Sequence, residues 1–465
     1  MIRLHIMLNN RRRFVLSAAM GAVFVLLAAS ANAGVPAVTV WHVSKSSSNA
    51  TCTISATTCN TIGSAVSAAQ ADDIIVVGPG TYNELVTINT MALNLLGAQA
   101  GNDARVDRHG PESVVDATGK GNCAFIVRAS SVVIDGFTVT GGTGNTTPDP
   151  PPPPPPPAGI WVGAQAVSII NNILDKNNTG VSLAGMQLAV IEHNLFRNNN
   201  EPGAPNPGCG IVSNGGGYFS ITENEFTGNK GAAIDVNGSS GGMITNNTSE
   251  NDGAFVIFAG TTVVQFSHNR GKDFGHTGVL PVGFNSSSIY ADAAVDLGPG
   301  NIALVISDND LEKGEAPISN GIAFTTVFGT SCGYPPCTNN TAMNVRNNMI
   351  KRFPDYGIVV GEQSGTGMLG EFSFQKGVYP SWIVGNEVYD NGWVGIFIEA
   401  ASSYNSGISL FDNEAEGNRV DCEDDTKYGT GTPLPTGNTW FNNTGNSSSP
   451  TGLCTPGRGH DHDWR

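Results

Sequence analysis

Two glutamates form the candidate acid and base of this sequence. Glu362 and Glu399 each lie just beyond a short apolar strand pattern, GIVV at residues 357–360 and GIFI at residues 395–398. Because the two patterns occupy consecutive repeats, we expect the two carboxyl groups to approach each other. Such a pair suits general acid–base catalysis, and with loop carbonyl oxygens it could hold Ca²⁺. The alternative interpretation is a pair of solvated surface carboxylates.

Aromatic residues collect in the long segments that separate the later repeats. A sugar ring stacks its C–H face on an aromatic side chain while its hydroxyl groups hydrogen-bond to polar neighbours, so this composition is typical of carbohydrate sites. The alternative is that the aromatic side chains pack these long segments against the rest of the fold. The candidate substrate-binding residues are Tyr290, Phe328, Tyr334, Phe372, Tyr379 and Phe397.

The eight cysteines favour an oxidising compartment. Three pairs are candidates for disulfides, while the remaining two cysteines stand in apolar strand patterns that are typical of buried thiols. No CxxC or Cys/His spacing indicates zinc, so the sequence assigns no metal and leaves only Ca²⁺ open as a cofactor. The three pairs are Cys52 with Cys59, Cys332 with Cys337, and Cys422 with Cys454.

The first 33 residues have the pattern of an export signal. Three arginines at residues 11–13 precede an apolar stretch, and Ala31-Asn32-Ala33 provides the small residues of a cleavage site. The arginines also resemble a twin-arginine signal, so both export routes stay open. A transmembrane anchor is the rival interpretation, which the alanine-rich core disfavours. We therefore expect a periplasmic, secreted or cell-surface protein, bacterial in type, that is not inserted in the membrane after cleavage.

The acidic composition limits the classes of partner. The full chain carries a formal net charge of −16, and removal of the four leader arginines makes it more negative. This charge disfavours nucleic acid and anionic membrane surfaces as partners. It also disfavours polyanionic polysaccharides unless Ca²⁺ bridges them to the protein. The sequence does not define an oligomeric state.

Asparagine recurs in one local frame, directly after a short apolar strand. The shortest steps between these asparagines are 22 and 23 residues, which is the period of stacked β-solenoid coils. An asparagine at one turn of every coil can hydrogen-bond to its neighbours and form a ladder. The frame contains Asn172, Asn194, Asn224, Asn247, Asn269, Asn309, Asn348, Asn386 and Asn413.

The N-terminal region carries the features of a solenoid end. Residues 62–71 predict a short amphipathic helix, followed by a strand at residues 74–77 and a Gly-Pro-Gly turn. This stretch and the phrase VVIDGFTV at residues 132–139 resemble the right-handed parallel β-helix proteins of the pectin-lyase-like superfamily. The resemblance covers roughly residues 60 to 440 and implies an all-β solenoid with an N-terminal capping helix. It matches no particular enzyme family, since His276 lies in Gly-His-Thr-Gly and not in the Gly-His-Gly of polygalacturonases.

A second strand pattern follows each asparagine turn and places one variable residue outward. In the enzymes that this chain resembles, the substrate cleft runs along such a strand face. The outward positions nowhere supply two carboxylates on adjacent coils, which weighs against a two-acid glycosidase centred on this strand. We expect these positions to be Trp161, Ser182, Val212, Asp235, Ile257, Leu280, Ala323, Val359, Phe397 and Asp421.

The spacing of the asparagines locates the functional region. The steps lengthen to 40, 39 and 38 residues before Asn309, Asn348 and Asn386, so the segments between about residues 280 and 400 carry insertions. Insertions on neighbouring coils commonly form the walls of a binding site. We expect this face to bind, and as an enzyme to cleave as a lyase or glycoside hydrolase, an extracellular or envelope carbohydrate polymer. The alternative function is a non-catalytic surface, adhesion or structural scaffold.

The expected organisation has four parts. A signal peptide at residues 1–33 precedes a lead-in at residues 34–59 with a disulfide. A parallel β-helix spans residues 60–440, interrupted by a proline-rich loop at residues 148–157, and a tail spans residues 441–465. Eight consecutive prolines cannot donate hydrogen bonds to a β-ladder, so this loop must leave the stack.

Overall fold

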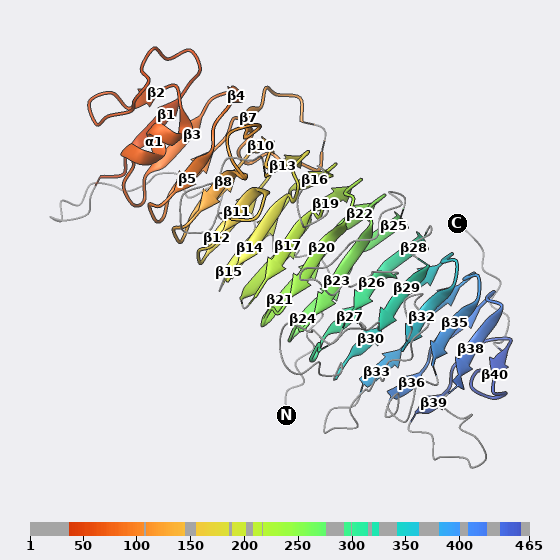
Figure 1. Ribbon diagram of the computed structural model, residues 1–465. Coiled ribbons are helices and arrows are strands. Elements are labelled where there is room, and N and C mark those ends of the chain that lie inside the picture. Colours follow the sequence, from red (N-terminus) through yellow and green to blue (C-terminus); the bar gives the residue numbers. More distant parts are fainter. Residues whose placement is uncertain are drawn as a thin grey trace, which may run out of the picture. The chain divides into compact units, whose positions relative to one another are not determined.

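The structure is a computed structural model that describes residues 37–106, 108–144, 155–185, 188–200, 208–215, 217–275, 293–298, 300–314, 319–324, 342–361, 381–399, 408–425 and 438–456. Three all-parallel sheets run side by side along the stack of coils, and each complete coil contributes one strand to each sheet in turn (Figure 1). Residues from Thr39 onward form one compact unit. None of the described helices is long and apolar enough to cross a membrane.

Sheet 1 has 15 strands, and every strand pairing in it is parallel. Its order is β2 (Thr58–Cys59), β1 (Val40–Val43), β3 (Ile74–Val77), β6 (Asn94–Leu96), β9 (Val133–Asp135), β12 (Val167–Ile170), β15 (Leu188–Glu192), β18 (Tyr218–Thr222), β21 (Gly241–Thr245), β24 (Val264–Ser267), β27 (Val305–Ser307), β30 (Asn344–Arg346), β33 (Ser381–Val384), β36 (Ile408–Phe411) and β39 (Thr439–Phe441).

Sheet 2 has 12 strands and follows sheet 1 after a sharp corner in each coil. In chain order its strands are β4 (Gly80–Tyr82), β7 (Ser113–Asp116), β10 (Phe137–Thr140), β13 (Ile173–Asp175), β16 (Leu195–Arg197), β19 (Glu225–Thr227), β22 (Thr248–Glu250), β25 (Arg270–Phe274), β28 (Asp310–Gly314), β31 (Met349–Lys351), β34 (Glu387–Tyr389) and β37 (Glu414–Glu416).

Sheet 3 has 13 strands and carries the glycine-containing strand pattern of the sequence. Its strands are β5 (Val86–Ile88), β8 (Cys123–Val127), β11 (Ala158–Val162), β14 (Val181–Ala184), β17 (Ile211–Asn214), β20 (Ala232–Asn237), β23 (Ala254–Ala259), β26 (Ala293–Leu297), β29 (Asn320–Phe324), β32 (Tyr356–Val360), β35 (Val394–Ile398), β38 (Val420–Asp424) and β40 (Ser448–Ser449).

The interior of the stack is apolar because alternate strand residues point inward. Inward residues at the same register stack on each other from coil to coil, as Ile169, Ile191 and Ile221 do in sheet 1. Phe196 and Phe226 stack in the same way, with ring centroids 4.8 Å apart. Burial of this continuous column is the main stabilising term of the fold.

The N-terminal end carries the one helix of the described residues, α1 (Ile62–Ala68). Ile62, Ala65 and Val66 are buried, and α1 contacts strands β1, β3 and β5. The carboxylate of Glu84 accepts hydrogen bonds from the N–H groups of Ile62 (3.0 Å) and Gly63 (2.9 Å), which satisfies donors that a helix N-terminus leaves unpaired. The helix ends before residue 71, because Ala69 is already extended.

An asparagine ladder closes the corner between sheets 1 and 2. Each ladder Oδ1 accepts two hydrogen bonds from the asparagine of the preceding coil, one from its backbone N–H and one from its Nδ2. Asn224, for example, accepts from Asn194 at 3.1 and 3.0 Å and donates through its Nδ2 to Asn247. The ladder runs unbroken from Asn172 to Asn443, which extends the predicted frame by one coil.

A second ladder, which the sequence analysis did not identify, lies at the corner between sheets 2 and 3. Asn177, Asn199 and Asn229 repeat the same pattern, and Asp252 ends the series. The Oδ1 of Asp252 accepts from the backbone N–H (2.7 Å) and Nδ2 (2.9 Å) of Asn229, while Ser249 donates to its Oδ2 at 2.7 Å. Burial raises the pKa of Asp252 to about 7.

At the same corner, the non-glycine residues that precede the ladder asparagines form a second row, which is exposed from Asn246 onward. These residues adopt a left-handed backbone with φ between 52° and 58°, which Asn, Asp and His tolerate better than other side chains. We call this set the corner row, and its members in chain order are Asn171, His193, Glu223, Asn246, His268, Asp308, Asn347, Asp412 and Asn442.

Candidate functional site

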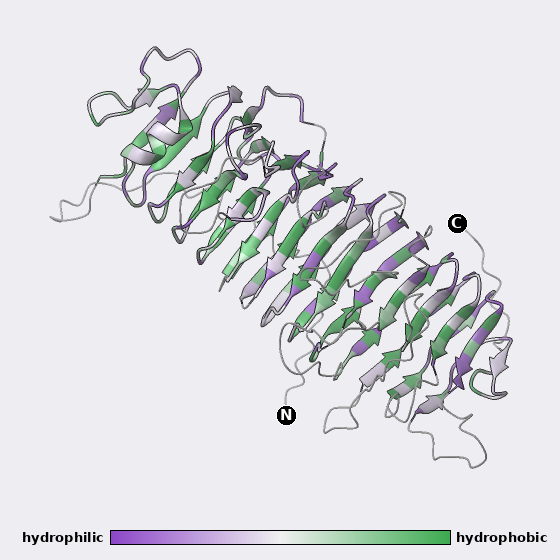
Figure 2. Ribbon diagram, viewed as in Figure 1, coloured by the Kyte–Doolittle hydropathy of each residue, from purple (hydrophilic) through white to green (hydrophobic). Residues whose placement is uncertain are grey.

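The outward residues of sheet 3 form a row that follows the stack of coils. Strand register aligns Ile126, Trp161, Ser182, Val212, Asp235, Ile257, Asp296, Ala323, Val359, Phe397 and Glu423. We call this set the outward row. Figure 2 shows the strands of sheet 3 as largely hydrophobic, whereas β38 at the C-terminal end is largely hydrophilic.

The register corrects two sequence assignments in this row. Asp296 of β26 pairs with Ile257, so the expectation that Leu280 occupies this place is wrong. Glu423, and not Asp421, pairs with Phe397. The first error arose because the apolar tetrapeptide at residues 278–281 has the sequence of a strand, and the second is a shift of two residues within β38. Only hydrogen-bonded pairing decides which residues align in the sheet.

Three aromatic rings form a platform at the C-terminal end of this face. Tyr356 stacks against Phe397, with centroids 5.2 Å apart and planes at 16°, and also against Trp393 at 6.1 Å and 19°. Trp393 is 49% exposed, and the guanidinium of Arg419 lies 5.9 Å from its ring centroid. We call Tyr356, Trp393 and Phe397 the aromatic platform. It presents a half-exposed indole with a cation over its ring.

Two carboxyl groups stand next to the aromatic platform. Because Ile398 pairs with Asp424, the following residues Glu399 and Asp425 occupy equivalent positions on adjacent coils. Adjacent strands of a sheet lie about 4.8 Å apart. Alternation along the strand also puts Glu399 on the same side as Phe397. Phe397, Glu399, Glu423 and Asp425 therefore form a four-residue patch on two neighbouring coils.

The electrostatics of this patch favour a protonated acid. Burial and the nearby charge of Asp425 raise the pKa of Glu399 to about 7. Burial and neighbouring carboxylates also raise the pKa of Glu423 and of Asp425. Near neutral pH, Glu399 can thus carry a proton, as a general acid requires.

Asp235 and Asp296 form a second pair of acids in the outward row, separated by Ile257. Both are buried, Asp235 at 4% exposure and Asp296 at 0%. Burial raises the pKa of Asp235 to about 7, although Asn237 donates a hydrogen bond to its Oδ1 at 2.8 Å. The exposed aromatic ring and the partly exposed acids lie at β32–β38, so that end of the face is the candidate site.

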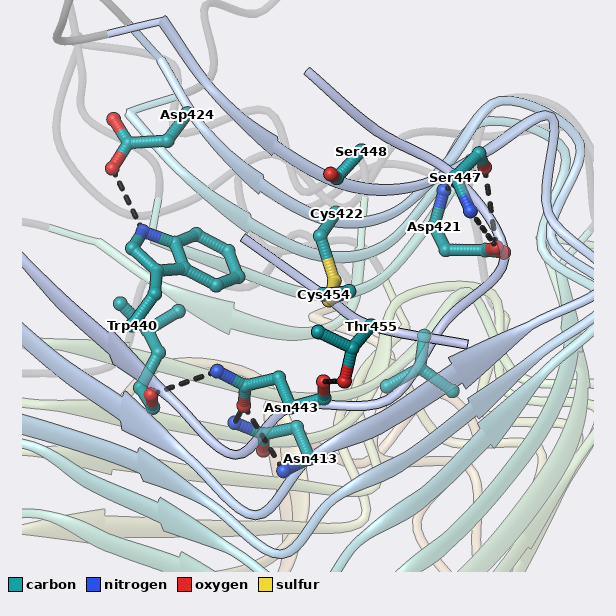
Figure 3. Close-up of a disulfide and its surroundings, with 12 residues drawn as sticks. Asn413, Asp421, Cys422, Asp424, Trp440, Asn443, Ser447, Ser448, Cys454 and Thr455 are labelled. Carbon is teal, nitrogen blue, oxygen red and sulfur yellow. Dashed lines mark hydrogen bonds between the residues drawn. A yellow bond between two sulfur atoms is a disulfide. The ribbon is translucent and has the colours of Figure 1, made fainter. Parts of the chain in front are cut away.

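The acidic run at residues 421–425 divides between structural and site roles. Asp421 accepts hydrogen bonds from the N–H groups of Asn446 (2.7 Å) and Ser447 (3.0 Å), and Asp424 accepts from Nε1 of Trp440 at 2.8 Å. Figure 3 shows both contacts beside the disulfide of the last coil. Glu423 and Asp425 are left for the site. No group of three or more His, Cys, Asp or Glu in the described ranges could hold a metal ion, so a Ca²⁺ site is not assigned.

The structure describes only some of the residues that the sequence analysis selected. It brings Phe397 and Glu399 together on β35 and its end, and it joins Cys52 to Cys59 and Cys422 to Cys454. Gly361 is opposite Glu399 in the preceding coil, since Val360 pairs with Ile398. The remaining residues lie outside the described ranges, and they are Glu362, Tyr290, Phe328, Tyr334, Phe372, Tyr379, Cys332 and Cys337.

Sequence reasoning missed four residues of the candidate site. Trp393 and Tyr356 lie just before or at the start of strands, and Glu423 and Asp425 lie in a run that suggests a solvated face. Their signal is the coil register, in which residues 397 and 399 align with residues 423 and 425. The step of 26 residues, from Phe397 to Glu423 and from Glu399 to Asp425, does not follow from the asparagine frame alone. It requires the hydrogen-bonded register of the strands.

Comparison with known proteins supports the fold. Residues 120–270 match the family model described as periplasmic copper-binding protein (NosD). Among solved structures, the catalytic unit of a thermostable GH87 alpha-1,3-glucanase from Streptomyces thermodiastaticus has a TM-score of 0.55 at 14% identity, covering 90% of this chain and 71% of that chain. No match to a curated protein was found.

Two further similar structures have lower scores. A PL6 alginate lyase in complex with a trisaccharide has a TM-score of 0.48 at 13% identity, covering 82% of this chain and 81% of that one. DFA-IIIase from Arthrobacter chlorophenolicus has a TM-score of 0.46 at 13% identity, covering 81% and 94%. The chain has the right-handed parallel β-helix fold that the sequence predicted.

The description of the matched family raises the question of copper. Imidazole and sulfur are the ligands that copper prefers. In the matched region His193 accepts a hydrogen bond from Arg105, and His268 is three coils away, about 14 Å at the usual strand spacing. The described residues of this region do not gather a copper ligand set, and no step is assigned to copper.

Proposed function

We propose that this protein is exported and binds an extracellular or envelope polysaccharide on the outward face of sheet 3, between β32 and β38. The observation that supports the proposal is the aromatic platform beside the carboxyl groups of Glu399 and Asp425. A sugar unit can pack against the exposed part of the Trp393 ring while its hydroxyl groups reach the neighbouring carboxylates.

The enzymatic form of the proposal is a glycoside hydrolase. Glu399 donates a proton to the glycosidic oxygen of the leaving group. The carboxylate of Asp425 acts as the nucleophile or base on the opposite side of the glycosidic bond. Retaining glycosidases separate their two carboxyl groups by about 5–5.5 Å and inverting enzymes by about 6.5–9.5 Å. A spacing of one coil, about 4.8 Å between strands, matches the retaining arrangement.

A lyase is the second enzymatic form. It needs a base and a cation that neutralises the developing charge on a uronate. Arg419, which contacts the platform, is the cation that the described site offers. Because the two acids stand closer to each other than to a basic cluster, hydrolysis is the preferred form.

The alternative is a non-catalytic surface or structural scaffold. The apolar character of the outward row, with Ile257, Ala323 and Val359 between its acids, favours this alternative. In that case the coil stack provides a stiff support and the aromatic platform is a binding surface only.

The test is a glycan array with the purified mature protein, followed by reducing-end and unsaturated-product assays with and without Ca²⁺. Binding without product on every bound polysaccharide would remove both enzymatic forms and leave the binding proposal. Absence of binding across the array would support the scaffold. For any turnover found, Glu399→Gln and Asp425→Asn should each lower kcat by at least about a hundredfold. Glu250→Gln, on the exposed face of sheet 2, is the matched control.

A further inference from the structure

A groove lies at the corner between sheets 1 and 2, on a different surface from the aromatic platform. It encloses about 640 Å³ and follows the corner row across the coils of Asn246, His268, Asp308 and Asn347. Three carboxylates, those of Asp308, Asp310 and Glu387, line it together with a single arginine, Arg270. The lining is mostly polar and its charged residues are mostly acidic, so the groove suits a cationic ligand.

The first six members of the corner row contain one order of residue types twice. Asn171, His193 and Glu223 stand on three successive coils, and Asn246, His268 and Asp308 repeat the order Asn, His, acid on the next three. We call these sets the first triplet and the second triplet. All six residues have a left-handed backbone, so their side chains leave the corner in the same way.

The chain itself occupies the first triplet. Residues 101–106 and 108–112 lie across it, and Arg105 contacts Nδ1 of His193 from its Nη2 at 3.1 Å and donates to Glu223 at 3.2 Å. The N–H of Ala104 donates to the carbonyl of His193 at 3.1 Å.

A second arginine of the same segment engages the remaining member of the first triplet. Arg108 donates from Nη1 to the carbonyl oxygen of Asn171 at 2.8 Å, and its side chain is only 3% exposed. Two arginines three residues apart thus contact all three coils from a segment of turns and irregular structure. Arg105 reaches the His–acid pair and Arg108 reaches the asparagine carbonyl.

The second triplet has the same residue types and is open. His268, Asp308 and Asn246 are exposed, whereas His193 and Glu223 are partly covered. Asn347 donates to Asp308 at 3.2 Å, which holds the carboxylate in the groove without neutralising its charge. We propose that the second triplet is a docking site for an Arg-x-x-Arg segment of a partner protein, whose two arginines bind as Arg105 and Arg108 bind the first triplet.

This assignment goes beyond the proposed function, because it concerns another corner of the coil stack and needs no carbohydrate. An arginine, and not a lysine, is expected at the His–acid pair. The guanidinium of Arg105 holds Asp103 of its own segment through Nε (3.0 Å) and Nη2 (2.7 Å), and the same Nη2 reaches His193 and Glu223. A lysine ammonium cannot reproduce this bidentate contact while it reaches the His–acid pair.

The test uses a synthetic, fluorescein-labelled peptide with the sequence of residues 101–112 and the full mature protein, measured by fluorescence anisotropy. Binding is expected to weaken with added salt. Replacing both arginines of the peptide by alanine should weaken it at least about tenfold, and replacing both by lysine should also weaken it. No binding at millimolar protein, or equal binding of the alanine peptide, would overturn the proposal.

Protein variants locate the binding. His268→Asn and Asp308→Asn keep a residue that tolerates positive φ, and each should weaken peptide binding about three- to fivefold. Asp412→Asn removes the same charge from the corner row outside the second triplet and should leave binding unchanged. Unaltered urea midpoints establish that the variants fold. If Asp308→Asn has no more effect than Asp412→Asn, the peptide binds elsewhere or exchanges with residues 101–112, and the proposal is wrong.

Discussion

Oδ1 of Asn309 accepts hydrogen bonds from both the backbone N–H and the Nδ2 of Asn269, each at 3.0 Å, although 40 residues separate the two in sequence. Asn309 in turn donates to the carbonyl of Phe266 and to Oδ1 of Asn348. One buried amide therefore ties three successive coils together, even where a long insertion lies between them.

Removal of this amide should destabilise the protein strongly. Asn309→Ala leaves the buried N–H and Nδ2 of Asn269 and the carbonyl of Phe266 without their partner, which we expect to cost about 2–4 kcal/mol in the free energy of unfolding. Urea unfolding followed by circular dichroism measures the change. Asp308→Asn, one residue earlier and exposed, is the matched control. Equal midpoints for the two variants would contradict a structural role of the ladder.

Asp252 should make stability depend on pH. Its pKa is raised to about 7 in the folded chain, above the usual value of about 4 in the unfolded one. The folded state therefore binds more protons between these values, and stability falls as pH rises from about 4 through 7. Below pH 7, the protonated Oδ2 can donate to Ser249.

Asp252→Asn removes the contribution of this group. We expect the urea midpoint of the variant to decline less between pH 5 and pH 8 than that of the natural chain. In unfolding free energy, the difference between the two declines is at most about 4 kcal/mol. Asp412→Asn changes an exposed aspartate and should keep the natural pH profile. A variant and natural chain with parallel profiles would show that Asp252 is ionised throughout.

The disulfide between Cys422 and Cys454 should stabilise the last coil. It closes a loop with a sequence separation of 32 and lies among the hydrogen bonds of Asp421 and Asn443 (Figure 3). The chain-entropy relation gives about 3–4 kcal/mol for a loop of this length, and less for the shorter loop of Cys52 and Cys59. Replacing both cysteines of each pair by serine and comparing urea midpoints tests the difference. A larger decrease in the urea midpoint when Cys52 and Cys59 are replaced than when Cys422 and Cys454 are replaced would contradict this order.

Carbohydrate binding, where the glycan array finds it, should depend on Trp393. Loss of the exposed ring in Trp393→Ala removes the stacking surface, and we expect affinity to fall about tenfold. Trp382 is a matched control, since it is 39% exposed but lies on β33 of sheet 1. Isothermal titration with the bound polysaccharide measures both variants. Similar losses in Trp382→Ala and Trp393→Ala would place the binding surface outside sheet 3.

The short-range pattern of the sequence is sufficient to predict the architecture. Each ladder asparagine follows an apolar strand at a sharp turn, and a period near 22 residues admits few arrangements other than stacked coils. The same frame predicts the hydrogen bonds of Asn309, because equivalent turns must meet when coils stack in register. The helix at residues 62–68 is likewise predictable from local amphipathic spacing.

The tertiary structure decides which side chains meet across coils. Asp296 enters the outward row and Leu280 does not, because the choice between two apolar segments depends on pairing with β23 and not on composition. Glu399 comes opposite Asp425 only through the pairing of β35 with β38. Local chemistry sets the turn and the strand of each coil. Register between coils is a long-range property, and the candidate site, the second ladder and the docking groove all depend on it.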